Sequence, residues 1–193
     1  MRSENLILIA DAGSTKTSWC LKSKSSVLKM FTTSGVNPSV QSVDEIEKVF
    51  VEQLLMHIPN VRNVSGIFFY GAGCTPQRSS IVKDVFVDIG FSQTEILIES
   101  DILGAAKAVC GNSPGVVGIL GTGSNSCRYD GEKIVENTPS LGFILGDEGS
   151  GAYIGKRLVS DCLKGILSER LSNIFLKETK LNVPLIIQKV YRE

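Results

Sequence analysis

The sequence predicts an α/β protein in which a unit of strands and helices begins twice. Apolar runs that fit strands alternate with amphipathic stretches that fit helices along residues 1–111, in the order three strands, helix, strand, helix, strand and helix. The apolar run at 115–120 then enters the turn GTGS, much as the run at 6–10 enters DAGST. We therefore expect a first domain over 1–111 and the start of a second, similar domain over 115–193.

The elements of the first domain follow from apolar spacing and from cap and turn residues. Strands are expected at 6–10, 19–21, 27–31, 67–70 and 96–98. A capping box of Ser42 and Glu45 opens the first helix, because each side chain can satisfy a backbone N–H group. The pair Thr75-Pro76 fits the N-cap and first position of the second helix, which Gly90 ends, and a third helix covers 102–110.

The second domain is expected to be incomplete. Strands are predicted at 115–120, 127–129 and 133–135, the last two joined by an Asp130-Gly131 hairpin turn, and a long helix at 149–167. Only 79 residues follow position 114, against 111 in the first domain. We therefore expect a fragment or truncated product, although a shortened second domain also fits the sequence.

Composition excludes several classes of protein. Lys plus Arg (20) equals Asp plus Glu (20), so no net charge favours nucleic acid or an anionic membrane. The amino terminus does not fit a signal peptide, and no run approaches the ~18 apolar residues of a membrane span. The five cysteines are widely spaced without a CxxC pair, which argues against a zinc site or disulfide framework and favours the cytoplasm. His57 is the single histidine, and it falls in a predicted helix just before Pro59, which argues against histidine-based catalysis.

The two turns after the apolar runs fit a phosphate site. Glycine-rich turns after strands gather backbone N–H groups around one point, and small hydroxyls add donors. The candidates are Gly13, Ser14, Thr15, Lys16 and Thr17 in the first turn, and Gly121, Thr122, Gly123 and Ser124 in the second. Asp11 would repel a phosphate but suits a hydrated Mg²⁺ that bridges phosphates. The pattern is not a P-loop, and each turn alone also fits a plain tight turn.

Four motifs, DAGSTKT, ESDILGAA, GTGSN and GDEGS, resemble in order and spacing the sugar kinase, actin and heat-shock chaperone superfamily. Within it they are similar to the BadF/BadG-type ATPases and most closely to the N-acetylglucosamine kinases. The resemblance implies ribonuclease-H-like (actin-like ATPase) domains, the first with a mixed five-stranded sheet. It also implies ATP and Mg²⁺ as cofactors, with the phosphates held by residues 11–15 and 121–124.

The resemblance further implies a catalytic base and sugar-binding residues. Asp101 would accept the proton of the sugar hydroxyl, whereas the residues alone fit a helix N-cap equally well. The positions that match sugar contacts are Asn37, Gly73, Asn125 and Asp147. Ordinary turn and cap roles would also explain the two asparagines and Asp147. In N-acetylglucosamine kinases an aromatic residue follows the first asparagine. Pro38 stands at that position here, so the resemblance does not extend to the pocket for the acetamido group.

These observations favour ATP-dependent phosphorylation of an amino sugar such as N-acetylglucosamine. A sugar or nucleotide sensor of the same fold is an alternative, as is the activator ATPase of a 2-hydroxyacyl-CoA dehydratase. Sugar and ATP are the expected partners, and the resemblance leaves a homodimer open. Because the adenine pocket in this superfamily comes mostly from the later second domain, we expect residues 1–193 alone to be inactive.

Overall fold

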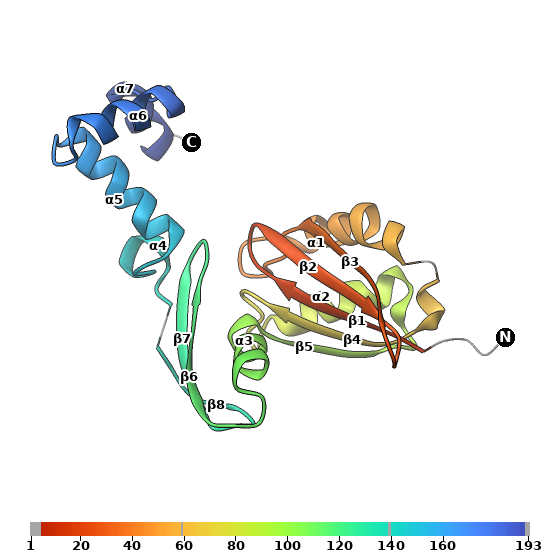
Figure 1. Cartoon of the computed structure of the whole chain (residues 1–193). Coiled ribbons are helices and arrows are strands. Elements are labelled where there is room, and N and C mark those ends of the chain that lie inside the picture. The colour runs from red at the N-terminus through yellow and green to blue at the C-terminus, as the bar shows by residue number, and fades with distance from the viewer. Residues whose placement is uncertain (1–4, 59, 139, 192–193) are drawn as a thin grey trace. The chain divides into compact units, whose positions relative to one another are not determined.

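The computed structural model describes residues 5–58, 60–138 and 140–191 (Figure 1). These residues form two compact units. The first lies within residues 1–119 and 125–139, and the second within 120–124 and 140–193. The predicted domain ranges, which include residues outside the described part, stay a prediction.

A mixed five-stranded sheet forms the centre of the first unit and confirms the predicted fold class. Its strands are β1 (Leu6–Ala12), β2 (Lys16–Lys22), β3 (Val27–Ser34), β4 (Val64–Gly71) and β5 (Glu95–Ser100). They lie in the order β3-β2-β1-β4-β5. The β3-β2-β1 pairings are antiparallel and the β1-β4-β5 pairings are parallel. The parallel strands β1, β4 and β5 therefore bring their carboxyl ends to one edge of the sheet.

One face of this sheet is covered by the helices that follow β3 and β4. These are α1 (Val43–Val49), continued by turns at Phe50–Leu54 and Leu55–His57, and α2 (Ser79–Phe86), continued by Val87–Phe91. A short turn at Val61–Asn63 leads into β4. Trp19 is 1% exposed, and its ring contacts those of Phe50, Phe69 and Phe86. This aromatic cluster fixes which side chains of β1 and β2 point into the core.

Two predicted helix starts meet different outcomes. The capping box of Ser42 and Glu45 is present at α1. The predicted start of α2 at Thr75-Pro76 is wrong, because that helix begins at Ser79. The Thr75 carbonyl instead accepts N–H bonds from Arg78 and Ser79, which makes residues 75–78 a turn. The Arg78 guanidinium donates to the Pro38 carbonyl at 2.7 Å, so this turn is tied to the segment after β3.

The other face of the sheet receives α3 (Asp101–Cys110), and a second small sheet lies on the far side of that helix (Figure 1). That sheet contains β6 (Gly115–Leu120), β7 (Ser124–Tyr129) and β8 (Ile134–Thr138), in this order. The β7–β8 pairing confirms the predicted hairpin. Ile102 and Ala106 of α3 pack with Val117, Cys127 and Tyr129. On its other side, a Cβ on Gly104 would lie 2.7 Å from the Tyr70 side chain, so α3 approaches β4 very closely.

Helices dominate the second unit. They are α4 (Gly142–Leu145), α5 (Gly151–Leu163), α6 (Glu169–Thr179) and α7 (Val183–Tyr191). The predicted helix over 149–167 is too long at both ends, because Ser150 caps α5 and Gly165 adopts φ +68° just after it. Among the described residues, no helix has the length and apolar character needed to cross a membrane.

Candidate functional site

Asp11 and Asp101 lie on the α3 side of the large sheet. The core face of β1 carries Leu8, Ala10 and Ala12, so Asp11 points to the opposite face. Asp11 stands beside Ser18 of β2 and Tyr70 of β4. Asp101 begins α3 directly after β5. The two carboxylates are near enough for the charge of Asp11 to raise the pKa of Asp101.

The environment of Asp101 favours a reactive carboxyl group. Burial is the main cause that raises the pKa of Asp101 above that of an ordinary aspartate, and the Asp11 charge adds to it. The Ile102 N–H donates to Asp101 Oδ1 at 2.8 Å and opposes part of this shift. Ser100, not Asp101, occupies the N-cap position. The N-cap interpretation of Asp101 is therefore not what the structure shows.

The first predicted phosphate turn is braced by backbone from two other segments. Within the turn, the Gly13 N–H donates to the Lys16 carbonyl at 2.9 Å. The Gly35 N–H donates to the Thr15 carbonyl at 3.0 Å, and Ala72 N–H to Ala12 at 2.8 Å. A Cβ on Gly35 would overlap the Ser14 backbone, so only glycine allows this approach. Outside these contacts, the side chains of Ser14, Thr15 and Lys16 are exposed.

Thr17 differs from the other residues of this turn. It pairs with Ala12 and lies two residues before Trp19 on β2. Side chains two residues apart on a strand share a face, so Thr17 points toward the core with Trp19 and away from the Asp11 side. Thr17 is 0% exposed, and its hydroxyl has no hydrogen-bond partner among the described residues. The Thr17 hydroxyl is therefore not on the face of the sheet that carries Asp11.

Asn37 links the first turn to the loop after β4. Its Nδ2 donates to Ser14 Oγ at 2.8 Å, and its Oδ1 accepts from the Ser39 N–H at 2.9 Å. Gly73 has φ +73°, and a Cβ there would overlap Asn37 Oδ1. The structure thus brings together two residues that the sequence predicted separately. The Asn37 carbonyl also accepts turn bonds from residues 40 and 41, so the expected Asn-Pro turn exists as well.

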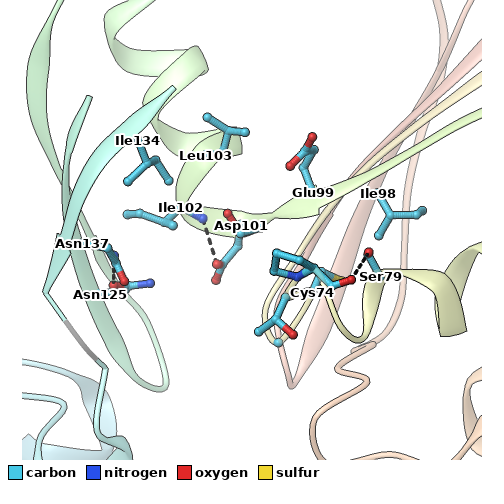
Figure 2. Close-up of a pocket in the computed structure, with 14 residues that line it drawn as sticks. Cys74, Ser79, Ile98, Glu99, Asp101, Ile102, Leu103, Asn125, Ile134 and Asn137 are labelled. Carbon is cyan, nitrogen blue, oxygen red and sulfur yellow. Dashed lines mark hydrogen bonds between the residues drawn. The ribbon is translucent and has the colours of Figure 1, made fainter. Parts of the chain in front are cut away.

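A pocket of about 700 Å³ opens at the amino end of α3, between the large sheet and the β7–β8 hairpin (Figure 2). Predicted site residues Gly73, Asp101 and Asn125 line it. Residues that the sequence analysis did not identify also line it, among them Cys74, Ser79, Leu103 and Asn137. Burial, with a smaller effect from Asp101, raises the pKa of the Cys74 thiol to about 12, so it remains protonated at neutral pH.

The second predicted phosphate turn lies in the second unit, where α5 and Asp147 hold it. The N–H groups of Gly151 and Ala152 donate to the carbonyls of Gly121 and Thr122, at 2.8 and 3.1 Å. Asp147 is 7% exposed and has φ 61°, which is unusual for a residue other than glycine. Its Oδ1 accepts from the Ser124 N–H and the Ser140 hydroxyl, each at 3.1 Å. The described contacts of Asp147 therefore shape this turn.

The residues of the first unit fit a magnesium–nucleotide complex. No group of three or more His, Cys, Asp or Glu side chains in the described chain could hold a metal ion. Mg²⁺ bound through a single carboxylate takes its other ligands from phosphate oxygens and water. The exposed Asp11 beside a braced turn with hydroxyl and lysine side chains provides such a carboxylate and such a phosphate environment.

Comparison with solved structures identifies the family. A provisionally named N-acetylglucosamine kinase from Porphyromonas gingivalis is 44% identical, with a TM-score of 0.91 over 96% of this chain. The chain belongs to the BadF/BadG-like family of actin-like ATPases. It spans 66% of the length of that relative.

More distant structures show the same fold. A provisionally named N-acetylglucosamine kinase from Chromobacterium violaceum is 20% identical, with a TM-score of 0.77, over 99% of this chain and 70% of its own. A non-polymerising MamK mutant bound to AMPPNP is 12% identical, with a TM-score of 0.56, over 91% of this chain and 65% of its own. No protein-family model and no curated protein matches the chain.

Proposed function

We propose that this family member is an ATP-dependent kinase for an amino sugar, N-acetylglucosamine or a related hexosamine, with Asp101 as the base. The observation that carries the proposal is the position of Asp101. Its carboxyl group has a raised pKa, lines a pocket and lies near Asp11. Asp11 in turn directly precedes the braced turn. A base, a metal ligand and a phosphate turn are the parts that phosphoryl transfer to a hydroxyl requires.

Asp101 would accept the proton of the attacking sugar hydroxyl. The hydroxyl oxygen bonds to the terminal phosphorus of ATP, the bond from that phosphorus to ADP breaks, and the hydroxyl proton moves to the carboxylate. Because the pKa of Asp101 is raised above the ordinary value, its carboxylate is a stronger base than that of an ordinary aspartate.

The two turns would hold the phosphates of ATP. Gly13, Ser14, Thr15 and Lys16 offer backbone, hydroxyl and ammonium donors in the first turn, and residues 121–124 offer a second set. Asp11 would hold Mg²⁺ by way of its carboxylate. When bound, this ion neutralises charge on the phosphate oxygens.

The sugar would be held by the residues that match sugar contacts in the family, Asn37, Gly73, Asn125 and Asp147. Asn125 lines the pocket, and Asn37 and Gly73 form the loop contact described above. Asn37 uses one amide hydrogen and one lone pair internally, so each end of its amide can still bond a hydroxyl.

We further propose a cytoplasmic location, which five free thiols favour.

The proposal is tested by ADP release from the full-length natural protein over N-acetylglucosamine, N-acetylmannosamine, glucosamine and glucose. We expect sugar-dependent ADP release that is fastest with an N-acetylated hexosamine. Sugar binding without turnover would instead indicate a sensor. ATP hydrolysis that no sugar accelerates would indicate an activator ATPase.

A further inference from the structure

Two asparagine side chains meet at the wall of the pocket. Asn125 is the second residue of β7, and Asn137 comes from the facing strand β8. Asn137 Nδ2 donates to Asn125 Oδ1 at 2.9 Å and also to the Ser126 carbonyl at 2.9 Å. Both hydrogens of the Asn137 amide group are therefore used, one in each bond. Figure 2 shows the pair on the hairpin side of the pocket.

The backbone determines how both amides are oriented. A carbonyl oxygen can only accept, so Ser126 requires the NH₂ end of Asn137 to face it. The same NH₂ group then lies against Asn125, which must present its own oxygen to it. The NH₂ end of Asn125 is thereby turned away from Asn137, as its amide nitrogen in Figure 2 shows. Reversing either amide would place two acceptors or two donors against each other.

We propose that Asn137 is a positioning residue that fixes Asn125 as a hydrogen-bond donor to the pocket. The consequence for the substrate rests on the proposed function. One polar side of the pocket then donates hydrogen bonds and the other accepts them. Asn125 donates, so the substrate must offer an oxygen acceptor there. Asp101 as a carboxylate only accepts, so the substrate must offer a hydroxyl donor there. A sugar with neighbouring hydroxyls satisfies both.

The test uses residues 1–193 with Asn137→Asp and Asn137→Leu. The aspartate has no NH₂ group, so Asn125 gains by reversing its amide and donating to the new carboxylate. The leucine removes the hydrogen bond to Asn125 but offers it no new acceptor, so Asn125 gains nothing by reversing its amide. Asn173→Asp on α6 is the matched control, because this exposed residue lies outside the pocket and receives the same change of charge. Melting temperatures and backbone amide spectra identify any variant that fails to fold.

The first measurement is the side-chain NH₂ signals of Asn125 in the ¹⁵N-labelled chain. We expect them to move in Asn137→Asp and to stay in place in Asn173→Asp. Unmoved Asn125 signals in folded Asn137→Asp would overturn the inference. Because this readout needs no ligand, moved signals in a protein that binds no sugar would support the inference while contradicting the proposed function.

The second measurement is calorimetric affinity for N-acetylglucosamine. We expect a loss of about fivefold in Asn137→Leu and a larger loss in Asn137→Asp. The double variant of Asn125→Ala with Asn137→Leu should bind no more weakly than Asn125→Ala alone, because Asn137 acts through Asn125. Losses that simply add in the double variant would contradict the proposed role.

Discussion

Asp101 combines a chemical role with a cost in stability. Folding raises the pKa of its carboxyl, mainly through burial. Its favourable contribution to stability is thus present below the unfolded-state pKa and lost as pH rises through the folded-state pKa. Ionisation of this buried carboxyl group therefore opposes folding, as expected of a group retained for chemistry.

We therefore expect Asp101→Asn to melt at or above the parent temperature and to lose roughly 10²–10⁴-fold in turnover, because asparagine keeps the Ile102 contact but accepts no proton. Calorimetric melting and ADP release on the full-length natural protein check the two parts. Asp44→Asn is the matched control, since Asp44 lies in the first turn of α1. That change should lower stability by about 0.3–1 kcal/mol with turnover intact. Near-parent turnover in Asp101→Asn would remove Asp101 as the base.

A second residue-scale prediction concerns the neighbour of Asp101. Replacing Asp11 with Asn removes a like charge, so the pKa of Asp101 should fall. Carboxyl ¹³C signals followed through a pH titration of residues 1–193 measure this directly. An unchanged Asp101 titration would mean that the two carboxylates do not interact.

A substitution at Thr17 tests whether its side chain faces the core rather than the side of the sheet that carries Asp11. Its hydroxyl is buried without a described partner, so Thr17→Val should maintain or raise the free energy of unfolding, by up to about 1–3 kcal/mol. Nucleotide affinity should hardly change, because the side chain faces the core. Denaturant unfolding and ATP titration give the two values. A large loss of ATP affinity in a stable variant would return Thr17 to the phosphate site.

At the scale of the elements, the first turn depends on a glycine from another segment. A Cβ on Gly35 would overlap the Ser14 backbone, so Gly35→Ala must displace the turn. We expect ATP affinity and stability to fall together. Gly155→Ala is the control, because that glycine lies inside α5 with open space around it and should gain up to about 1 kcal/mol from alanine. Unchanged ATP binding in Gly35→Ala would show that the phosphates do not use this turn.

The sequence predicted the order of elements better than their ends. Apolar runs mark only the buried part of a strand, so β2 was predicted at 19–21 and extends over Lys16–Lys22 through pairing with its neighbours. Thr75-Pro76 is a good helix start locally, yet a turn tied to Pro38 delays α2 to Ser79. Such contacts between distant segments leave no local pattern.

The site was predictable to a similar degree. Motif order pointed to Asp11 near the end of β1, to Asp101 directly after β5 and to Asn125 near the start of β7. Thr17 was grouped with the turn because the types of residue in a turn do not tell which face each side chain takes. Its position two residues before Trp19 on the same strand did carry that information. Asn137 could have been found from the Asp130-Gly131 hairpin, whose register places it opposite Cys127, two residues from Asn125. Bracing by Gly35 had no sequence signal.

At the scale of the whole molecule, the chain spans 66% of the length of its relative from Porphyromonas gingivalis. We propose that residues 1–193 bind N-acetylglucosamine, because the pocket that Asp101 and Asn125 line belongs to the first unit. Calorimetry with this sugar tests the expectation. No measurable heat of binding in the folded chain would contradict it.

The burial of α3 between two sheets has a consequence for motion. Its residues Ile102 and Ala106 face the small sheet, while Gly104 lies against β4, so the helix cannot open without separating both contacts. In native-state hydrogen exchange, the amides of α3 should therefore be among the most protected of the first unit, exchanging only through its global unfolding. Exposed turns such as residues 13–16 should exchange far sooner. The proposed base would thus be carried by a helix that is held on two sides, and the phosphates by a segment that opens sooner.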